Sequence, residues 1–463
     1  MREKVGSHTM RSQSSKPDAR TGTATRRAAV AAVATALALT ASACAGGASS
    51  PAASTNTTAA AKPLPTVTGP VTITYDEVDS SGTLKTTLAS IVASFEKANP
   101  DITVQLDPYA NYGALQTADT AKLASHTAPT MAQAYESWAA TYASDNSILP
   151  ISTLAGTSTP AELSTFYTGV KNDLYLPDGK LWMWPASKSV QVFFYNQDQY
   201  GKDNLTVPTN WTDFATDAKA ASTGGVTAMT VDPTADGETL LETITEANGG
   251  AMYDSKGNPT FTNPQAVAAG TYIQNLKTAG ALKVGAVGTY PGETALGAQK
   301  GMFDLSSVAG YYYEKSAAGG KFTVGAFPMP GGTSNKSTFM AGANEVVFSS
   351  ATQQQQAAAW AFLQYLASPS VQATWAAGTG YLPITPAALT TSAMTSFVAQ
   401  NSYVTAAANS LDSAFTDPAY KWVTACGTDL GVAMQAILDN NTAPATALAT
   451  AQSSCQATQS ADQ

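Results

Sequence analysis

The chain has 463 residues, of which only 12% are charged, and its formal net charge at neutral pH is −9. Proteins that bind nucleic acid usually carry a basic surface that follows the phosphates, so this acidic balance argues against a nucleic-acid partner. The length also exceeds what one hydrophobic core usually serves, so we expect two lobes.

The N-terminal segment has the pattern of an export signal. Arg26 and Arg27 lead into residues 28–39, an uncharged and mostly apolar run that is too short to span a bilayer. The run ends near Ala41-Ser42-Ala43-Cys44, which resembles a bacterial lipobox. We therefore predict a signal peptide over residues 1–43 and lipidation of Cys44. The alternative is ordinary signal cleavage nearby, with Cys44 an incidental thiol.

The segment that follows Cys44 is rich in Gly, Ala, Ser, Thr and Pro and has few large apolar side chains. Such a composition cannot bury a core, so residues 44–68 are predicted to form a flexible tether. Removal of residues 1–43 leaves 17 basic and 31 acidic residues, a net charge of −14. The expected product is an acidic body held by a lipid on the extracytoplasmic face of the cell membrane.

The body begins with an α/β pattern. Residues 71–75 alternate as a strand, apolar residues between 84 and 95 recur on one helical face, and residues 102–106 resume the strand period. A strand, helix, strand unit favours a parallel sheet with right-handed crossovers. A second lobe is expected to begin near the β-prone run 190–196, which precedes a helix through Phe214.

Cys426 and Cys455 are the only cysteines after Cys44. In an oxidising exported compartment two cysteines are more often paired than reduced, so we predict a disulfide between them. The alternative is two buried, reduced thiols.

Several short motifs, taken in order, resemble the middle of the family 1 extracellular solute-binding proteins of ABC importers. They are Gly179-Lys180-Leu181-Trp182, Pro185, Tyr195-Asn196-Gln197-Asp198 and Trp211-Thr212-Asp213-Phe214. Within that family, residues 379–385 and the pairs Asn111-Tyr112 and Tyr135-Glu136 look most like the binders of glycerol-3-phosphate and glycerophosphodiesters, beside the sugar-binding lipoproteins. The resemblance covers nearly the whole exported body.

The resemblance implies a two-lobed α/β fold of the periplasmic-binding-protein type II class. Lobe 1 would comprise residues 69–185 and 320–380, and lobe 2 residues 186–319 and 381–460. The chain would cross between the lobes near residues 184–190, 316–322 and 378–384. A ligand would be trapped in the cleft when the hinge closes.

The same resemblance supplies a ligand site. The positions at which the glycerol-phosphate binders hold their ligand correspond to Tyr112, Glu136, Ser189, Ser307, Gly342 and Tyr381. Glu136 would accept hydrogen bonds from ligand hydroxyls. The serine and tyrosine hydroxyls and the Gly342 N–H would donate to phosphate oxygens.

Two departures from the family pattern bear on the ligand. The phosphate-binding Arg expected after Phe415-Thr416 is missing, and Lys421 nearby cannot offer the two-pronged contact of Arg. Asp232 and Asp236 replace a Trp-rich stretch and would suit sugar hydroxyls, unless they only shape a turn. The ligand is therefore expected to be glycerol-3-phosphate, a glycerophosphodiester or a sugar.

The rival class is an exported hydrolase that uses paired carboxylates to cleave glycosides. A Ser-His-Asp centre would depend on His126, whose setting is better explained as a helix end. No zinc motif, nucleophile elbow or phosphate-binding glycine loop is present. We therefore expect a monomeric binding protein without a metal or cofactor, whose partners are its ligand and the subunits of an ABC permease.

Overall fold

The computed structural model describes residues 64–334 and 338–462. The predicted signal peptide, Cys44 and nearly all of the tether lie outside these residues, so the expectations for them stay predictions. Among the helices of the described residues, none combines the length and the hydropathy that a membrane span needs.

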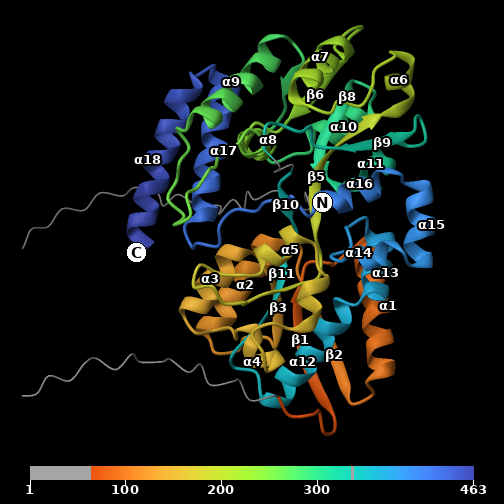
Figure 1. Ribbon diagram of the computed structural model, residues 1–463, viewed down its shortest axis with the longest axis vertical. Helices are drawn as coiled ribbons and strands as arrows, with labels where there is room; N and C mark the ends of the chain where they lie inside the picture. The colour runs from red at the N-terminus through yellow and green to blue at the C-terminus, as the bar shows by residue number, and fades with distance from the viewer. Residues whose placement is uncertain (1–63, 335–337, 463) are drawn as a thin grey trace, which may run out of the picture. The chain divides into compact units, whose positions relative to one another are not determined.

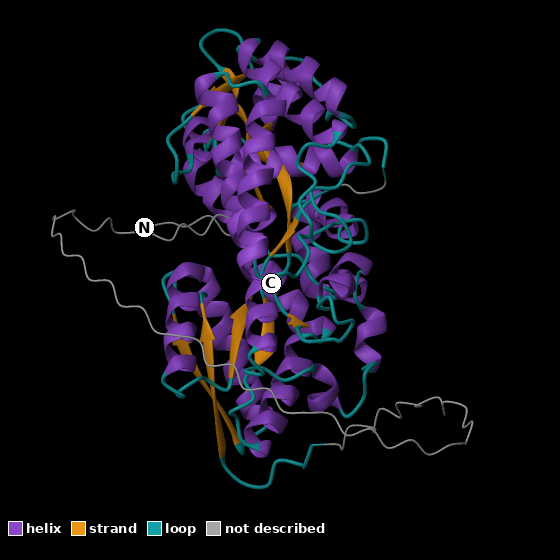
Figure 2. Ribbon diagram, turned by 90° about the vertical axis from the view of Figure 1, so that its left-hand side faces the viewer, coloured by secondary structure: helices purple, strands orange, loops and turns teal. Residues whose placement is uncertain are grey.

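Two mixed β-sheets with surrounding helices form the framework, as the α/β prediction requires (Figures 1 and 2). The first sheet has the strand order β2-β1-β3-β11-β4. Its strands are β1 (Val71–Glu77), β2 (Ile102–Pro108), β3 (Met131–Ala134), β4 (Trp184–Pro185) and β11 (Asn344–Val347). Strand β1 pairs in parallel with β2 and β3, whereas β11 is antiparallel to both of its neighbours.

The second sheet has the order β10-β5-β8-β6-β7, and β9 also pairs with β5. Its strands are β5 (Ser189–Asn196), β6 (Thr227–Val231), β7 (Leu282–Val284), β8 (Gly301–Ser307), β9 (Val324–Pro328) and β10 (Met340–Ala341). Every residue of β5 is buried, which fits the continuous β-prone run seen in the sequence.

Helices enclose both sheets. The first core is associated with α1 (Gly82–Ala98), α2 (Tyr112–Ala124), α3 (Glu136–Ser144), α4 (Ile151–Ala155), α5 (Thr168–Asp173), α12 (Gln353–Leu366) and α13 (Pro369–Thr379). The second core is associated with α6 (Gln197–Lys202), α7 (Trp211–Ala221), α8 (Ala235–Ala247), α9 (Pro264–Thr278), α17 (Val423–Asn440) and α18 (Pro444–Asp462). The remaining helices are α10 (Pro291–Gly297), α11 (Tyr311–Ala318), α14 (Pro386–Leu389), α15 (Ser392–Gln400), α16 (Tyr403–Ser410) and the 3-10 turns η1 (Ala161–Thr165) and η2 (Val308–Gly310).

Asparagine side chains begin several of these helices. The Asn111 side chain accepts a hydrogen bond from the Ala114 N–H at 2.7 Å, and Asn210 caps α7 in the same way. Asn263 caps α9, where Pro264 occupies the first helical position and needs no N–H partner. The Asn111 cap fixes where α2 starts and so places Tyr112 in its first turn.

The chain passes from the first sheet to the second between β4 and β5 and returns between β10 and β11, at Gly342. The crossing expected at residues 316–322 is therefore wrong. Strand β9 follows that segment and stays in the second sheet, because it pairs along β5 from Val192 to Asn196. The other predicted lobe boundaries stay predictions.

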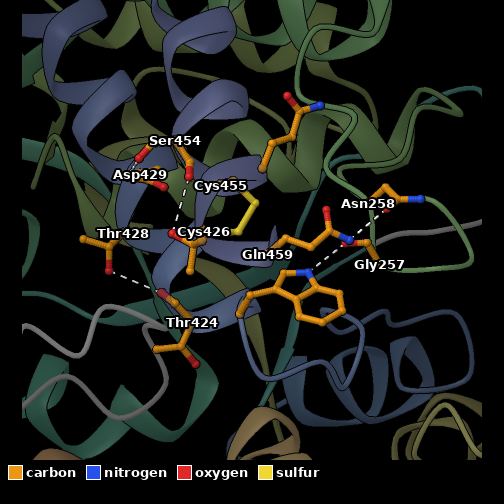
Figure 3. Close-up of a disulfide and its surroundings, with 12 residues drawn as sticks. Gly257, Asn258, Thr424, Cys426, Thr428, Asp429, Ser454, Cys455 and Gln459 are labelled. Carbon is orange, nitrogen blue, oxygen red and sulfur yellow. Dashed lines mark hydrogen bonds between the residues drawn. A yellow bond between two sulfur atoms is a disulfide. The ribbon is translucent and has the colours of Figure 1, made fainter. Parts of the chain in front are cut away.

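Cys426 of α17 and Cys455 of α18 form a disulfide, with their Cα atoms 4.7 Å apart (Figure 3). Both residues are fully buried in the second core. Beside the disulfide, the Ser454 hydroxyl donates to Asp429 at 2.9 Å. The disulfide and this hydrogen bond tie the last two helices of the chain together.

Candidate functional site

A cavity of about 380 Å³ lies between the two cores. From the first core it is lined by Glu136 at the start of α3 and by Asp173 at the end of α5. From the second core it is lined by Glu246 of α8. The segment 415–420, which contains Asp417, completes the wall. We call this space the acidic cavity, because these residues and the exposed Asp254 place five carboxyl groups in its wall.

Glu136 and Asp173 belong to a buried network centred on Lys188. The Lys188 ammonium lies 2.6 Å from Asp173 Oδ2 and 3.9 Å from Glu136 Oε1, and it donates to the Gly342 carbonyl at 2.8 Å. The Asn344 amide donates to Asp173 at 2.7 Å and to Glu136 at 3.2 Å. Lys188 is itself fully buried. Hydrogen bonds and ion pairs within the network therefore replace the hydration that its charges lose on burial.

The pKa values of the two carboxyl groups in this network are shifted in opposite directions. Burial raises the pKa of Glu136 well above its ordinary value, and the negative charge of Asp173 raises it further. Burial alone would raise the pKa of Asp173 as well, but the positive charge of Lys188 and hydrogen bonds to Asp173 lower it overall. One proton on Glu136 and one charge pair between Lys188 and Asp173 would therefore leave the group without net charge.

Aromatic rings belong to the apolar part of the cavity wall, together with aliphatic side chains such as Leu176 and Met252. Tyr253 is almost fully buried, and Tyr420 stacks on Trp422 with 4.7 Å between ring centroids. The Trp422 indole donates to the Gly257 carbonyl at 2.9 Å. Gly257 has a φ of 73° and lies against the Tyr420 ring, where any Cβ atom would overlap it. Carboxyl groups and ring faces together suit a ligand with hydroxyls on one side and C–H groups on the other.

Tyr112 and Tyr381 come together at a neighbouring place. Burial raises the pKa of both tyrosines, and their hydroxyl groups lie close enough for each to affect the pKa of the other. The Tyr112 ring contacts Tyr135 at a centroid distance of 4.8 Å, and Tyr381 stacks on Trp375 at 5.8 Å. Neither tyrosine is among the residues that line the acidic cavity. Tyr135, which directly precedes Glu136, connects the tyrosine pair to the cavity wall along the chain.

The other predicted ligand residues do not line the acidic cavity either. Ser189 begins β5 and pairs with Ala341, and its hydroxyl is buried. The Ser307 hydroxyl accepts from the Ala309 N–H at 3.2 Å. Gly342 has a φ of 101°, and its carbonyl contacts Lys188. The structure thus brings Ser189 and Gly342 to the crossings, and their ligand roles stay predictions.

Asp232, Asp236 and Lys421, which the sequence analysis considered as ligand residues, do not line the acidic cavity. Asp232 accepts hydrogen bonds from Thr234 and from the Gly288 N–H, and Asp236 accepts from the Asp232 N–H at 2.8 Å. These two carboxylates therefore shape the turn that begins α8. Lys421 is exposed and does not line the acidic cavity.

His126 lies at an exposed helix end with a φ of 57°. Within the described ranges, no group of three or more His, Cys, Asp or Glu residues is arranged to hold a metal ion.

Sequence reasoning missed Asp173, Lys188, Asn344, Tyr253 and Asp417. A lone lysine in Ala186-Ser187-Lys188-Ser189, directly before the β-prone run 190–196, was the available signal, because a buried lysine requires a carboxylate partner. The partner lies on another element, so the sequence alone does not identify it.

The fold and the cavity between two cores define a two-lobed binding protein. Residues 90–408 match the model of the bacterial extracellular solute-binding protein family, and the chain belongs to this family. The family consists of binding proteins, so the chain is a solute-binding protein and the hydrolase alternative is set aside.

Solved structures share the fold at low sequence identity. UgpB from Mycobacterium tuberculosis, solved in complex with glycerophosphocholine, has a TM-score of 0.73 and 18% identity over 85% of this chain and 99% of that one. The sugar-binding protein MalE from Xanthomonas citri has a TM-score of 0.73 and 17% identity over 84% and 98%. The GacH receptor of Streptomyces glaucescens, solved with acarbose, has a TM-score of 0.70 and 20% identity over 84% and 98%. No curated protein matches the sequence.

Proposed function

We propose that the chain is the substrate-binding component of an ABC importer and that it captures a neutral sugar in the acidic cavity. The observation that carries this proposal is the wall of the cavity, in which carboxyl groups from both cores accompany Tyr253 and Tyr420. Sugar hydroxyls can donate to carboxylates and accept from a protonated carboxyl, and aromatic faces cover the C–H side of a pyranose ring. Closure of the two lobes would hold the sugar until it is delivered to the permease.

The charge of the cavity favours a sugar over a phosphate. A phosphate presents only acceptor oxygens and negative charge at neutral pH, and proteins usually bind it with Arg, Lys or backbone N–H groups. Among residues 64–334 and 338–462, no Lys or Arg lines the cavity. Lys188 lies behind the wall and is already paired with Asp173.

A glycerophosphodiester or glycerol-3-phosphate is the second candidate. It is favoured by the Tyr112–Tyr381 hydroxyl pair, since hydroxyls of this kind can donate to phosphate oxygens. The solved complex of UgpB with glycerophosphocholine, which shares the fold, supports the same possibility.

The location belongs to the same proposal. Lipidation of Cys44 would tether the monomeric body to the extracytoplasmic face of the cell membrane, where the predicted tether, residues 44–68, would allow it to reach the permease.

A ligand screen on the mature chain tests the proposal. We would measure the melting temperature with maltose, maltotriose, acarbose, sn-glycerol-3-phosphate and glycerophosphocholine, and then the affinity of any hit by calorimetry. A ligand at a hundred times its Kd stabilises the folded state by about 2.7 kcal/mol, so a true ligand raises the melting temperature. Binding of a phosphate ligand alone would overturn the sugar assignment and keep the receptor. Turnover of a sugar would overturn the receptor itself.

A further inference from the structure

Lys188 lies near the junction of the two sheets and contacts two other segments of the chain there. It lies in the crossing between β4 and β5, and its carbonyl accepts from the Leu382 N–H at 2.8 Å. Its ammonium donates to the carbonyl of Gly342, which lies in the crossing between β10 and β11. Leu382 directly follows Tyr381. Lys188 therefore connects its own segment with two others that are distant in sequence.

The same ammonium also reaches the wall of the acidic cavity. Asp173 and Glu136 both line the cavity, and both face Lys188, whereas Lys188 does not line it. The ammonium contacts these two carboxyls, from α5 and α3, and the Gly342 carbonyl, and the Asn344 amide bridges the two carboxyls. Among the residues that line the cavity, Lys188 therefore contacts the two carboxyl groups.

A gain in folding stability does not by itself explain a buried lysine at position 188. A buried ion pair is often no more stable than apolar residues of the same volume, because the loss of hydration offsets the attraction between the charges. What the pair does provide is geometry. With Lys188 and Asn344 both bonded to Asp173 Oδ2, the Asp173 carboxylate has one orientation in the cavity wall.

We propose that Lys188 is a positioning residue for ligand binding, which holds Asp173 and Glu136 in one arrangement in the cavity wall and joins that wall to the chain crossings. This inference rests on the proposed function, because it takes the acidic cavity as the ligand site. A ligand that hydrogen bonds to Asp173 or Glu136 would bind a preorganised wall, and the loss of Lys188 would remove that preorganisation.

The test compares affinity with stability in three variants. Lys188→Met removes the charge, and Asp173→Asn with Lys188→Met removes the pair and leaves no buried charge without a partner. Lys122→Met is the matched control, because Lys122 bonds two carboxylates, Asp76 at 2.6 Å and Asp107 at 2.8 Å, away from the cavity. For each variant we would measure the melting temperature and the Kd for maltotriose and for glycerophosphocholine.

We expect Lys188→Met to lower the melting temperature and to weaken binding of whichever probe the unaltered protein binds by about tenfold or more. In the double variant the melting temperature should recover toward that of the unaltered protein while affinity stays weak, because the charge imbalance is gone but the positioned carboxylate is still missing. Lys122→Met should lower the melting temperature without changing Kd.

Two results would overturn the inference alone: unchanged affinity in Lys188→Met, or recovery of affinity together with stability in the double variant. The second result would mean that Lys188 acts only on stability. If Lys188→Met does not fold, the double variant still separates the two effects. If the unaltered protein binds neither these probes nor the other ligands of the screen, the proposed function is wrong and this inference is wrong with it.

Discussion

The hydroxyl groups of Tyr112 and Tyr381 lie close enough for each to affect the pKa of the other, although one residue begins α2 and the other follows α13. Tyr381 is almost fully buried and stacks on Trp375, whereas Tyr112 is half-buried. The pair thus joins the start of α2 to the segment whose next residue, Leu382, bonds to Lys188.

Tyr381→Phe tests whether this hydroxyl binds ligand. The variant keeps the ring on Trp375 and removes only the hydroxyl, whereas Tyr381→Ala would also leave a cavity that costs about 3 to 5 kcal/mol of stability. If Tyr381 is a ligand anchor, affinity for the hit of the screen should fall by about 2 kcal/mol, with little change in melting temperature. Calorimetry that gives the same Kd for Tyr381→Phe and the unaltered protein would remove Tyr381 from the site.

Local sequence patterns predicted the framework well. The alternation in residues 71–75 became β1, and the apolar face of the following segment became the buried side of α1, with Leu88 and Phe95 in the core. The family resemblance supplied the two-lobed fold. The pairing of β9 with β5 was not predicted, because the sequence of a strand does not identify the strand with which it pairs.

The sequence pointed to only part of the wall of the acidic cavity. Of the predicted ligand residues Glu136 lines it, and the ligand roles of all six stay predictions. Asp173 could not be found, because its significance comes from a lysine on another element and from the burial of both. Sequence periodicity reports which face of an element is apolar, but it does not report which polar side chains from different elements converge.

The stability of the protein should fall as the pH rises from about 5 to 8. Burial raises the pKa of Glu77 and that of Glu345 from the usual value near 4.5 to about 8. Between these values the folded state binds more protons than the unfolded state, so the free energy of unfolding decreases with increasing pH. The stabilisation is complete below the unfolded pKa and is lost as the pH passes the folded one.

Glu345→Gln provides the control for this pH dependence. An amide oxygen can still accept the hydrogen bond that the Tyr75 hydroxyl donates to Glu345 at 2.9 Å, but it does not titrate. Denaturant unfolding at a series of pH values should therefore give a shallower slope for the variant. Equal slopes in the two proteins would show that Glu345 does not contribute.

Reduction of the disulfide should destabilise the last two helices. Cys426 and Cys455 are 29 residues apart in sequence, and closing a loop of this order stabilises a protein by about 3 kcal/mol in the chain-entropy account. We expect no titratable thiol in the unfolded, non-reduced body and two after reduction, with a lower melting temperature. Two thiols before reduction would contradict the disulfide.

Cys44→Ser should release the protein from the membrane. Cys44 is the only lipidation candidate after the predicted signal peptide, and a Ser at this position cannot carry the thioether-linked lipid. Fractionation of cells that produce the variant should find it in the medium, whereas the unaltered protein should sediment with membranes. Retention of the variant to the same extent would show that the lipid anchor is wrong.

Glu136→Gln and Asp173→Asn should differ in stability although each replaces a buried carboxyl with an amide. Burial and Asp173 raise the pKa of Glu136, so we expect its carboxyl to be protonated near neutral pH, and an amide of the same shape should change the free energy of unfolding little. Asp173→Asn leaves the ammonium of Lys188 without its ionised partner, which costs about 3 to 5 kcal/mol for a buried pair. Denaturant unfolding of the two variants at pH 7 measures the difference. A loss of similar size in Glu136→Gln would mean that Glu136 is ionised and shares the charge of Lys188 with Asp173.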